Sequence, residues 1–240
     1  MSLAALRDEV VEANRALVEA GLVSLAFGNA SGVDREAGTM VIKPSGVPCD
    51  RLSPSDLVVV SLADERVVEG TLRPSSDTPT HALLYRRFPG IGGVVHTHSA
   101  FASAWAQAHR SIPALGTTHA DHFGGSVPVT RAMTRTEIAG EYERQTGEVI
   151  VETLESIGLD PLDMPAVIVA SHGPFTWGRS ATEAVTNAIA LEVVAALAFR
   201  TLALAPEPGP IDDALLRRHF ERKHGPSAYY GQANREPDGS

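Results

Sequence analysis

The sequence predicts an α/β fold: a single domain with a central, mostly antiparallel sheet that is covered by helices on its faces. Short runs of β-branched and apolar residues follow one another at hairpin spacing in the first third of the chain. Two further apolar runs lie later in the chain, and each of them ends at a histidine. Between these runs, apolar residues recur at helical spacing behind capping residues.

The expected strands are short. The first four cover residues 22–27, 39–42, 57–62 and 66–68. The other two run from Ile91 to His98 and from Ala166 to His172. Short connections join the early strands, which favours antiparallel hairpins over crossover units.

The expected helices are marked by their caps as well as by apolar spacing. Thr78 and Pro79 place a proline at the first helical position. The stretches 134–137 and 180–183 each have the serine or threonine and the glutamate of a capping box. We therefore expect helices over residues 3–20, 78–87, 99–109, 134–157, 180–204 and 211–223. Since no linker or repeat separates them, residues 1–232 form one domain and residues 233–240 a polar tail.

The composition favours a cytoplasmic protein with a sizeable core. The chain has 240 residues, of which 43% are apolar, and its single cysteine, Cys49, excludes an internal disulfide. No apolar stretch looks long enough to span a bilayer, and the first residues lack the layout of a signal peptide. The net charge of −9 argues against a nucleic acid partner. We expect a small-molecule partner, and neither a nucleic acid nor a membrane.

Three histidines form a candidate metal site. His96 and His98 lie two residues apart at the end of a strand, so their side chains share a face. His172 ends the second apolar run and can join them from a neighbouring strand. Three neutral imidazoles with an open coordination position are typical of catalytic zinc. Asp77 is the natural fourth group, although its place before a helix is equally typical of a simple cap.

Small residues form a candidate phosphate site. Ser75 and Ser76 lie at a helix N-terminus, where free N–H groups and the helix dipole favour an anion. Glycine-containing turns follow two of the β-like runs and let backbone N–H groups approach a ligand. Taken alone, each of these turns is better explained as an ordinary turn. Neither a Walker loop nor a dinucleotide fingerprint is present, so we expect no nicotinamide and no flavin. The candidate residues in the turns are Gly28, Asn29, Lys43, Ser45 and Gly46.

Taken together, these motifs resemble the class II sugar-phosphate aldolase/epimerase family. The matching stretches are residues 28–31, 43–46, 74–77, 96–98 and 171–173. Four further stretches resemble the branch that epimerises L-ribulose 5-phosphate at C4, namely residues 76–81, 116–121, 171–178 and 223–231. The resemblance covers about residues 4–232 and implies a class II aldolase-like fold.

The resemblance implies a role for each candidate residue. His96, His98 and His172 would bind Zn²⁺, with Mn²⁺ or Co²⁺ as alternatives, and Asp77 would lie near or on the metal. The phosphate contacts would fall on Gly28, Asn29, Lys43, Ser45, Gly46, Ser75 and Ser76. Asp121 and Tyr230 would be the acid/base pair. The roles of His119, His122 and His219, which lie on or near the same elements, are left open. The family also implies a homotetramer with its sites at subunit interfaces.

The implied reaction interconverts L-ribulose 5-phosphate and D-xylulose 5-phosphate. The C4 hydrogen is not α to the C2 carbonyl, so its removal gives no resonance-stabilised anion, and a redox route would need a bound cofactor. Retro-aldol cleavage of C3–C4, rotation of the aldehyde and re-addition remain. The alternatives are an aldolase that releases its aldehyde, a related dehydratase and, outside enzymes, an adducin-like structural module. Arabinose, ascorbate and other pentose pathways all fit this reaction.

Overall fold

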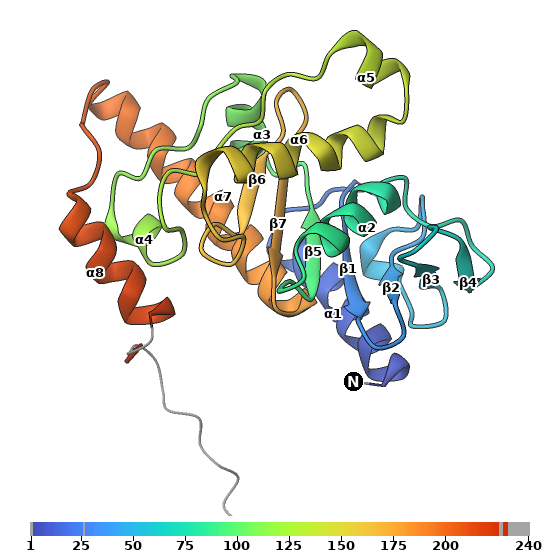
Figure 1. The fold of residues 1–240 in the computed structure, drawn as a ribbon. Helices are drawn as coiled ribbons and strands as arrows, with labels where there is room; N and C mark the ends of the chain where they lie inside the picture. The colour runs from blue at the N-terminus through green and yellow to red at the C-terminus, as the bar shows by residue number, and fades with distance from the viewer. Residues whose placement is uncertain (1, 26, 226–227, 230–240) are drawn as a thin grey trace, which may run out of the picture.

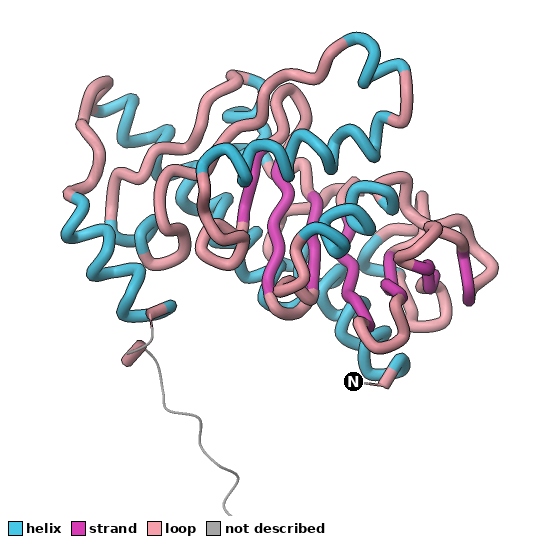
Figure 2. The backbone as a smooth tube through the Cα atoms, viewed as in Figure 1, coloured by secondary structure: helices cyan, strands magenta, loops and turns pink. Residues whose placement is uncertain are grey.

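The computed structural model describes residues 2–25, 27–225 and 228–229. A seven-stranded sheet forms its centre, in the order β4-β3-β2-β1-β5-β7-β6, and every neighbouring pair of these strands is antiparallel. Figure 2 shows the strands as a row with helices around it. The strands are β1 (Asn29–Asp34), β2 (Thr39–Ile42), β3 (Val58–Ser61), β4 (Val67–Glu69), β5 (Gly93–His96), β6 (Ala166–Ile168) and β7 (Pro174–Gly178). The predicted fold class is confirmed.

Helices cover both faces of the sheet. In Figure 1, α2 and α6 lie in front of the strands, and α1 and α7 lie behind them. A 3₁₀ turn, η1 (Cys49–Arg51), lies between β2 and β3. The helices are α1 (Leu3–Glu19), α2 (Thr78–Arg87), α3 (Ala100–Gln107), α4 (Thr117–Ala120), α5 (Arg135–Ala139), α6 (Tyr142–Ile157), α7 (Ala181–Leu204) and α8 (Asp213–His224).

The strands alternate between two hydrophobic clusters. On β5, Val94 packs in the cluster that includes α2 and α6, whereas Val95 packs in the cluster that includes α1. Met40 and Val41 of β2 divide in the same way. Successive side chains of a strand point to opposite faces, so a sheet covered on both sides has both sets buried.

The predicted strand over residues 22–27 is wrong. The described residues of that stretch form a loop, in which Leu22 and Val23 are buried against α1 and Leu25 has a positive φ of 59°. The strand begins instead at Asn29, among small polar residues that the β-propensity of the sequence does not favour. Apolar runs can be buried in a loop as well as in a strand, and here tertiary packing decided between the two.

The second histidine-bearing strand is shorter than expected. β6 ends at Ile168, and His172 lies in a tight turn in which Val169 N–H donates to Gly173 O at 2.9 Å. The chain then returns as β7, a strand outside the predicted ones that opens with Pro174, a residue that is uncommon inside sheets. His172 still lies beside β5, because β7 pairs directly with β5.

The long helix expected over residues 134–157 is two helices. The capping box of Thr134 and Glu137 is confirmed and opens α5. Gly140 ends that helix after five residues, and α6 begins at Tyr142. The N-cap of α2 is Asp77 rather than Thr78. The break at Gly140 bears directly on the site, because it allows the first turn of α6 to face the histidines.

α7 corrects the expectation that no apolar stretch has the length of a membrane span. Among the described helices, it alone has that length and apolar composition. It packs against the sheet, however, and the backbone of its N-terminal turn lies so close to β5 that a Cβ at Gly93 would be 2.4 Å from Ala181 Cα. Glu192 of α7 also accepts hydrogen bonds from the backbone N–H groups of Phe101 and Ala102. A helix that packs in the core of a protein can have the same length and apolar composition as a membrane span.

Candidate active site

His96 is held rigidly at the end of β5. Its ring stacks on Phe175 of the neighbouring strand, with centroids 4.2 Å apart and planes 16° apart. Its Nδ1 lies 3.0 Å from the carbonyl oxygen of Pro174, to which a protonated Nδ1 donates. The ring therefore directs Nε2 away from the sheet, toward His98, whose Nε2 is 3.0 Å away.

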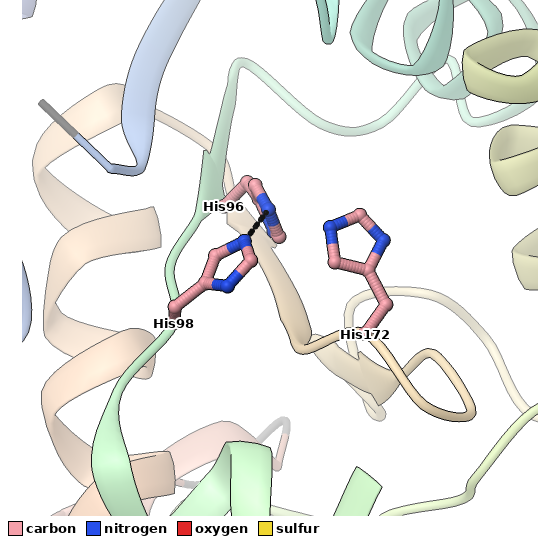
Figure 3. Close-up of side chains that lie close together, drawn as sticks. All are labelled: His96, His98 and His172. Atoms are coloured by element: carbon pink, nitrogen blue, oxygen red, sulfur yellow. Dashed lines mark hydrogen bonds between the residues drawn. The ribbon is translucent and has the colours of Figure 1, made fainter. Parts of the chain in front are cut away.

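The three predicted histidines meet at one point. His98 follows the strand end, His172 reaches in from the turn between β6 and β7, and their rings face that of His96 (Figure 3). One ligand nitrogen from each lies within 4.8 Å of the other two. Among the described residues, these three histidines form the group that could hold a metal ion.

The electrostatics of this cluster suit a metal ion. Burial and the neighbouring imidazoles of His96 and His98 lower the pKa of His172 to about 4. Burial, together with His96, also lowers the pKa of His98. Imidazoles with a low pKa are neutral at physiological pH and offer lone pairs, as metal ligation requires. The two Nε2 atoms lie 3.0 Å apart, close enough to bind one ion that lies to the side of both, with Zn–N bonds of about 2.0–2.1 Å.

Asp77 is turned toward the site instead of capping its helix. It occupies the N-cap position of α2, but its side chain makes no capping hydrogen bond. Its Oδ2 accepts from Asn29 Nδ2 at 2.6 Å. Burial alone would raise the pKa of Asp77, yet His96, His81 and the bond from Asn29 hold it below its usual range. Asp77 thus presents a carboxylate beside the histidine cluster.

The predicted metal and phosphate residues line one cavity of about 260 Å³. Ser75 N–H donates to Lys43 O at 3.0 Å, and Ser45 N–H donates to Arg73 O at 2.9 Å, so two of the loops are tied together. The third loop joins through Asn29, whose Nδ2 also reaches Ser75 Oγ at 3.1 Å. The cavity is lined by the predicted Gly28, Asn29, Lys43, Ser45, Gly46, Ser75, Ser76, Asp77, His96, His98 and His172, together with Phe27, Tyr142 and Glu143.

Gly28 must be a glycine for two reasons. Its φ is +84°, in the left-handed region that side chains disfavour. A Cβ at this position would also lie 2.8 Å from the carbonyl oxygen of His96. The loop before β1 can therefore lie directly against the strand end that carries the first histidine.

Asp121 does not line this cavity. It follows α4, which packs beside α8 at one end of the molecule, away from the end of β5 that carries His96 (Figure 1). Both of its carboxylate oxygens accept from Arg222 Nη2, at 2.8 Å to Oδ1 and 2.8 Å to Oδ2, and Oδ1 lies 3.0 Å from His219 Nδ1. The other predicted acid/base residue, Tyr230, lies outside the described residues. One chain therefore brings the metal and phosphate residues together, but not Asp121.

Three residues that line the cavity are not among the predicted site residues. Phe27 belongs to the loop that was expected to be a strand, and Tyr142 and Glu143 belong to the first turn of α6. No local motif marks Tyr142 or Glu143. Their place depends on the helix break at Gly140 and on the packing of α6, which only the tertiary structure determines.

The histidine cluster lies beside glycine- and serine-lined loops at the ends of central strands of an antiparallel sheet, an arrangement that suits a metal ion and a phosphate group. The chain belongs to the class II aldolase family, since the family described as Class II Aldolase and Adducin N-terminal domain matches residues 8–199.

Particular relatives lie within that family. L-ribulose-5-phosphate 4-epimerase UlaF from Salmonella paratyphi B is 54% identical over 227 residues, which are 95% of this chain and 98% of that protein. Among solved structures, an L-fuculose 1-phosphate aldolase superposes with a TM-score of 0.71 at 24% identity, over 91% of this chain and 95% of that chain. The L-fuculose-1-phosphate aldolase from Thermus thermophilus has a TM-score of 0.65 at 25% identity, over 85% of this chain and 99% of that chain.

Proposed function

We propose that this chain is an L-ribulose-5-phosphate 4-epimerase, an isomerase that interconverts L-ribulose 5-phosphate and D-xylulose 5-phosphate. The observation that carries the proposal is the single cavity in which the three histidines, Asp77 and the phosphate loops meet. The identity of 54% to an epimerase over 95% of the chain supports the choice of substrate.

The reaction in this proposal cleaves and remakes the C3–C4 bond. Loss of the C4 hydroxyl proton starts a retro-aldol cleavage to glycolaldehyde phosphate and the enediolate of dihydroxyacetone. The aldehyde turns, and C3 attacks its other face. Zn²⁺ held by His96, His98 and His172 would supply Lewis-acid stabilisation of the charge that develops during cleavage.

The phosphate loops have a specific task in this scheme. Lys43, Ser75 and the backbone N–H groups at Gly28 and Gly46 hold the phosphate end, so the aldehyde can rotate without leaving the cavity. Asn29 donates a hydrogen bond to Asp77 and so holds this carboxylate next to the histidines. An enzyme that failed to retain the aldehyde would act as an aldolase.

The proton transfers need groups on both faces of the aldehyde, and we assign them to Asp121 and Tyr230 of a neighbouring subunit in a homotetramer. The place of α4, which ends next to Asp121 and packs beside α8 away from β5, supports this assignment. Three apolar side chains at successive turns of α7 are exposed, which supports an interface on this helix: Ile189, Val193 and Leu197. We place the enzyme in the cytoplasm.

The test is to incubate zinc-loaded protein with L-ribulose 5-phosphate and to follow D-xylulose 5-phosphate and free glycolaldehyde phosphate together. We expect metal-dependent formation of xylulose phosphate without free aldehyde, and no turnover in a chelated control. Free aldehyde as the main product would make the protein an aldolase. No turnover by protein with bound metal would contradict the proposed substrate.

A further inference from the structure

We propose that Tyr142 is a positioning residue that holds His172 in its metal-binding orientation. This inference rests on the metal site of the proposed function, but not on its substrate. Tyr142 lines the cavity, yet none of the steps above uses it. Its hydroxyl oxygen lies 3.3 Å from Nδ1 of His172, and the two rings are 6.1 Å apart at 33°.

The geometry assigns different tasks to the two nitrogens of His172. The nitrogen that faces His96 and His98 lies on the far side of the ring from Cβ, so it is Nε2 (Figure 3). A neutral histidine that ligates a metal through Nε2 carries its proton on Nδ1. That Nδ1–H then donates to the Tyr142 hydroxyl oxygen. Such outer partners fix the tautomer and the ring orientation of metal-ligating histidines.

His172 needs this contact more than His96 does. His96 belongs to a strand, stacks on Phe175 and donates to a backbone carbonyl. His172 lies in a turn after Ser171, whose φ is 62°, and its side chain is only partly buried. A partly exposed ring on a turn has several rotamers, and a hydrogen bond to its outer nitrogen selects one of them.

Tyr142 is itself held in place by the packing of α6 on α2. The Thr80 hydroxyl donates to Glu143 O at 2.5 Å and anchors the first turn of α6. One turn later, the Thr146 hydroxyl donates to Tyr142 O at 2.9 Å. Gly147 lets the helices approach closely, because a Cβ there would lie 2.6 Å from Leu83 Cδ2. Since Asp77 is the N-cap of α2, one helix pair positions both Asp77 and Tyr142 around the histidines.

The decisive experiment compares the Zn²⁺ affinity of the parent protein and two variants, measured by chelator competition without any sugar. We expect Tyr142→Phe to weaken Zn²⁺ binding by about tenfold or more, in the range typical for loss of an outer partner. Tyr229→Phe removes the same hydroxyl from an exposed tyrosine and should leave the affinity unchanged. The metal-free melting temperatures of both variants should match that of the parent protein.

A double-mutant cycle separates positioning from a general structural effect. If Tyr142 acts through His172, then Tyr142→Phe should have no further effect on the residual Zn²⁺ affinity in a His172→Ala background. An affinity within twofold of the parent in the single Tyr142→Phe variant would overturn the proposal. So would an equal loss in both backgrounds, or a lowered metal-free melting temperature. If His172→Ala alone leaves the affinity unchanged, the metal site of the proposed function fails instead.

Discussion

Lys43 shows how one residue can serve the site at the expense of the fold. Its side chain is only 2% exposed, and its Nζ donates to Pro44 O in a long hydrogen bond of 3.3 Å. Burial lowers the pKa of Lys43, against the opposing influence of Cys49 and Asp77. A buried ammonium whose close partner is a neutral carbonyl destabilises a folded protein, whereas a dianionic phosphate in the cavity would supply an anionic partner.

Lys43→Met should therefore separate binding from stability. Loss of a charge-assisted hydrogen bond of about 1.5–3 kcal/mol corresponds to an increase in KM of roughly tenfold to a hundredfold. Because the phosphate does not react, kcat should change much less. The melting temperature should stay the same or rise. Steady-state kinetics and thermal unfolding check both points, with the exposed Arg66→Met as control. An unchanged KM would remove Lys43 from the phosphate site.

Asp121 gives a pH-dependent contribution to stability. Burial would raise its pKa, but hydrogen bonds from Arg222 and His219 and the charge of Lys223 hold the pKa below its usual range. A carboxyl group whose pKa is lower in the folded state stabilises that state at every pH above its unfolded pKa. This contribution is lost as the pH falls through the folded pKa, when Asp121 becomes protonated.

Asp121→Asn should accordingly lower the free energy of unfolding by about 1–3 kcal/mol at pH 7, the scale of a hydrogen-bonded charge. The difference from the parent protein should shrink as the pH falls below about 3.9, the usual pKa of an aspartate in an unfolded chain. Urea unfolding of both proteins, from pH 7 to below about pH 3.9, measures this difference in the free energy of unfolding. Asp8→Asn, at an exposed position of α1, is the control. A difference that stays constant with pH would contradict the assigned cause.

Residues that carry a local motif could be predicted from the sequence. His96, His98 and His172 meet as expected, because a two-residue spacing and a strand end restrict where their rings can point. Sequence left open whether Asp77 caps its helix, and the structure answers that it does not. Tyr142 could not be found, since its contact with His172 joins segments that no shared pattern connects.

At the scale of elements, the predicted helices were more accurate than the strands. Caps are local, so the ends of α1, α2 and α7 lie within a few residues of their predicted positions. Strand pairing is not local, and this explains the two errors. β1 has a polar sequence but lies in the middle of the sheet, and β7 begins at a proline but pairs on both sides.

Two glycines should show how closely elements pack. A Cβ at Gly93 would lie 2.4 Å from backbone atoms of Ala181, which can move only if α7 moves off the sheet. We expect Gly93→Ala to destabilise the protein by about 1–3 kcal/mol or more. At Gly147 the obstacle is the flexible end of Leu83, and alanine gains about 1 kcal/mol in helix propensity, so Gly147→Ala should be nearly neutral.

Chemical denaturation of the two variants measures this contrast, with Gly125→Ala as the control because no atom lies within 4 Å of its added Cβ. If Gly147→Ala proved as harmful as Gly93→Ala, the α2–α6 packing would be as rigid as the contact between helix and sheet. The first turn of α6, and with it Tyr142, would then be fixed more firmly than the hydrogen bonds alone indicate.

At the scale of the whole molecule, the described residues of the proposed reaction lie in two separate regions of the fold. The histidines and phosphate loops share a cavity, whereas Asp121 lies with α8 at another end of the fold. α7 runs between these regions and exposes Ile189, Val193 and Leu197 at a spacing of one helical turn. In a monomer these three apolar side chains stay exposed to water. A symmetric assembly would bury them and bring Asp121 of one chain to the cavity of the next.

Mixing two inactive variants tests this arrangement directly. His172→Ala removes a proposed metal ligand, and Asp121→Asn removes a proposed proton-transfer group, so each variant alone should be nearly inactive. In co-expressed, randomly mixed ring assemblies, about one site in four should combine an intact histidine cluster with an intact Asp121 from its neighbour, and activity should recover to roughly that fraction. If each chain used its own Asp121, every site would lack one group and no activity would return. Recovery that depends on co-expression, and that fails when the purified variants are mixed without subunit exchange, would locate the acid/base group across the interface.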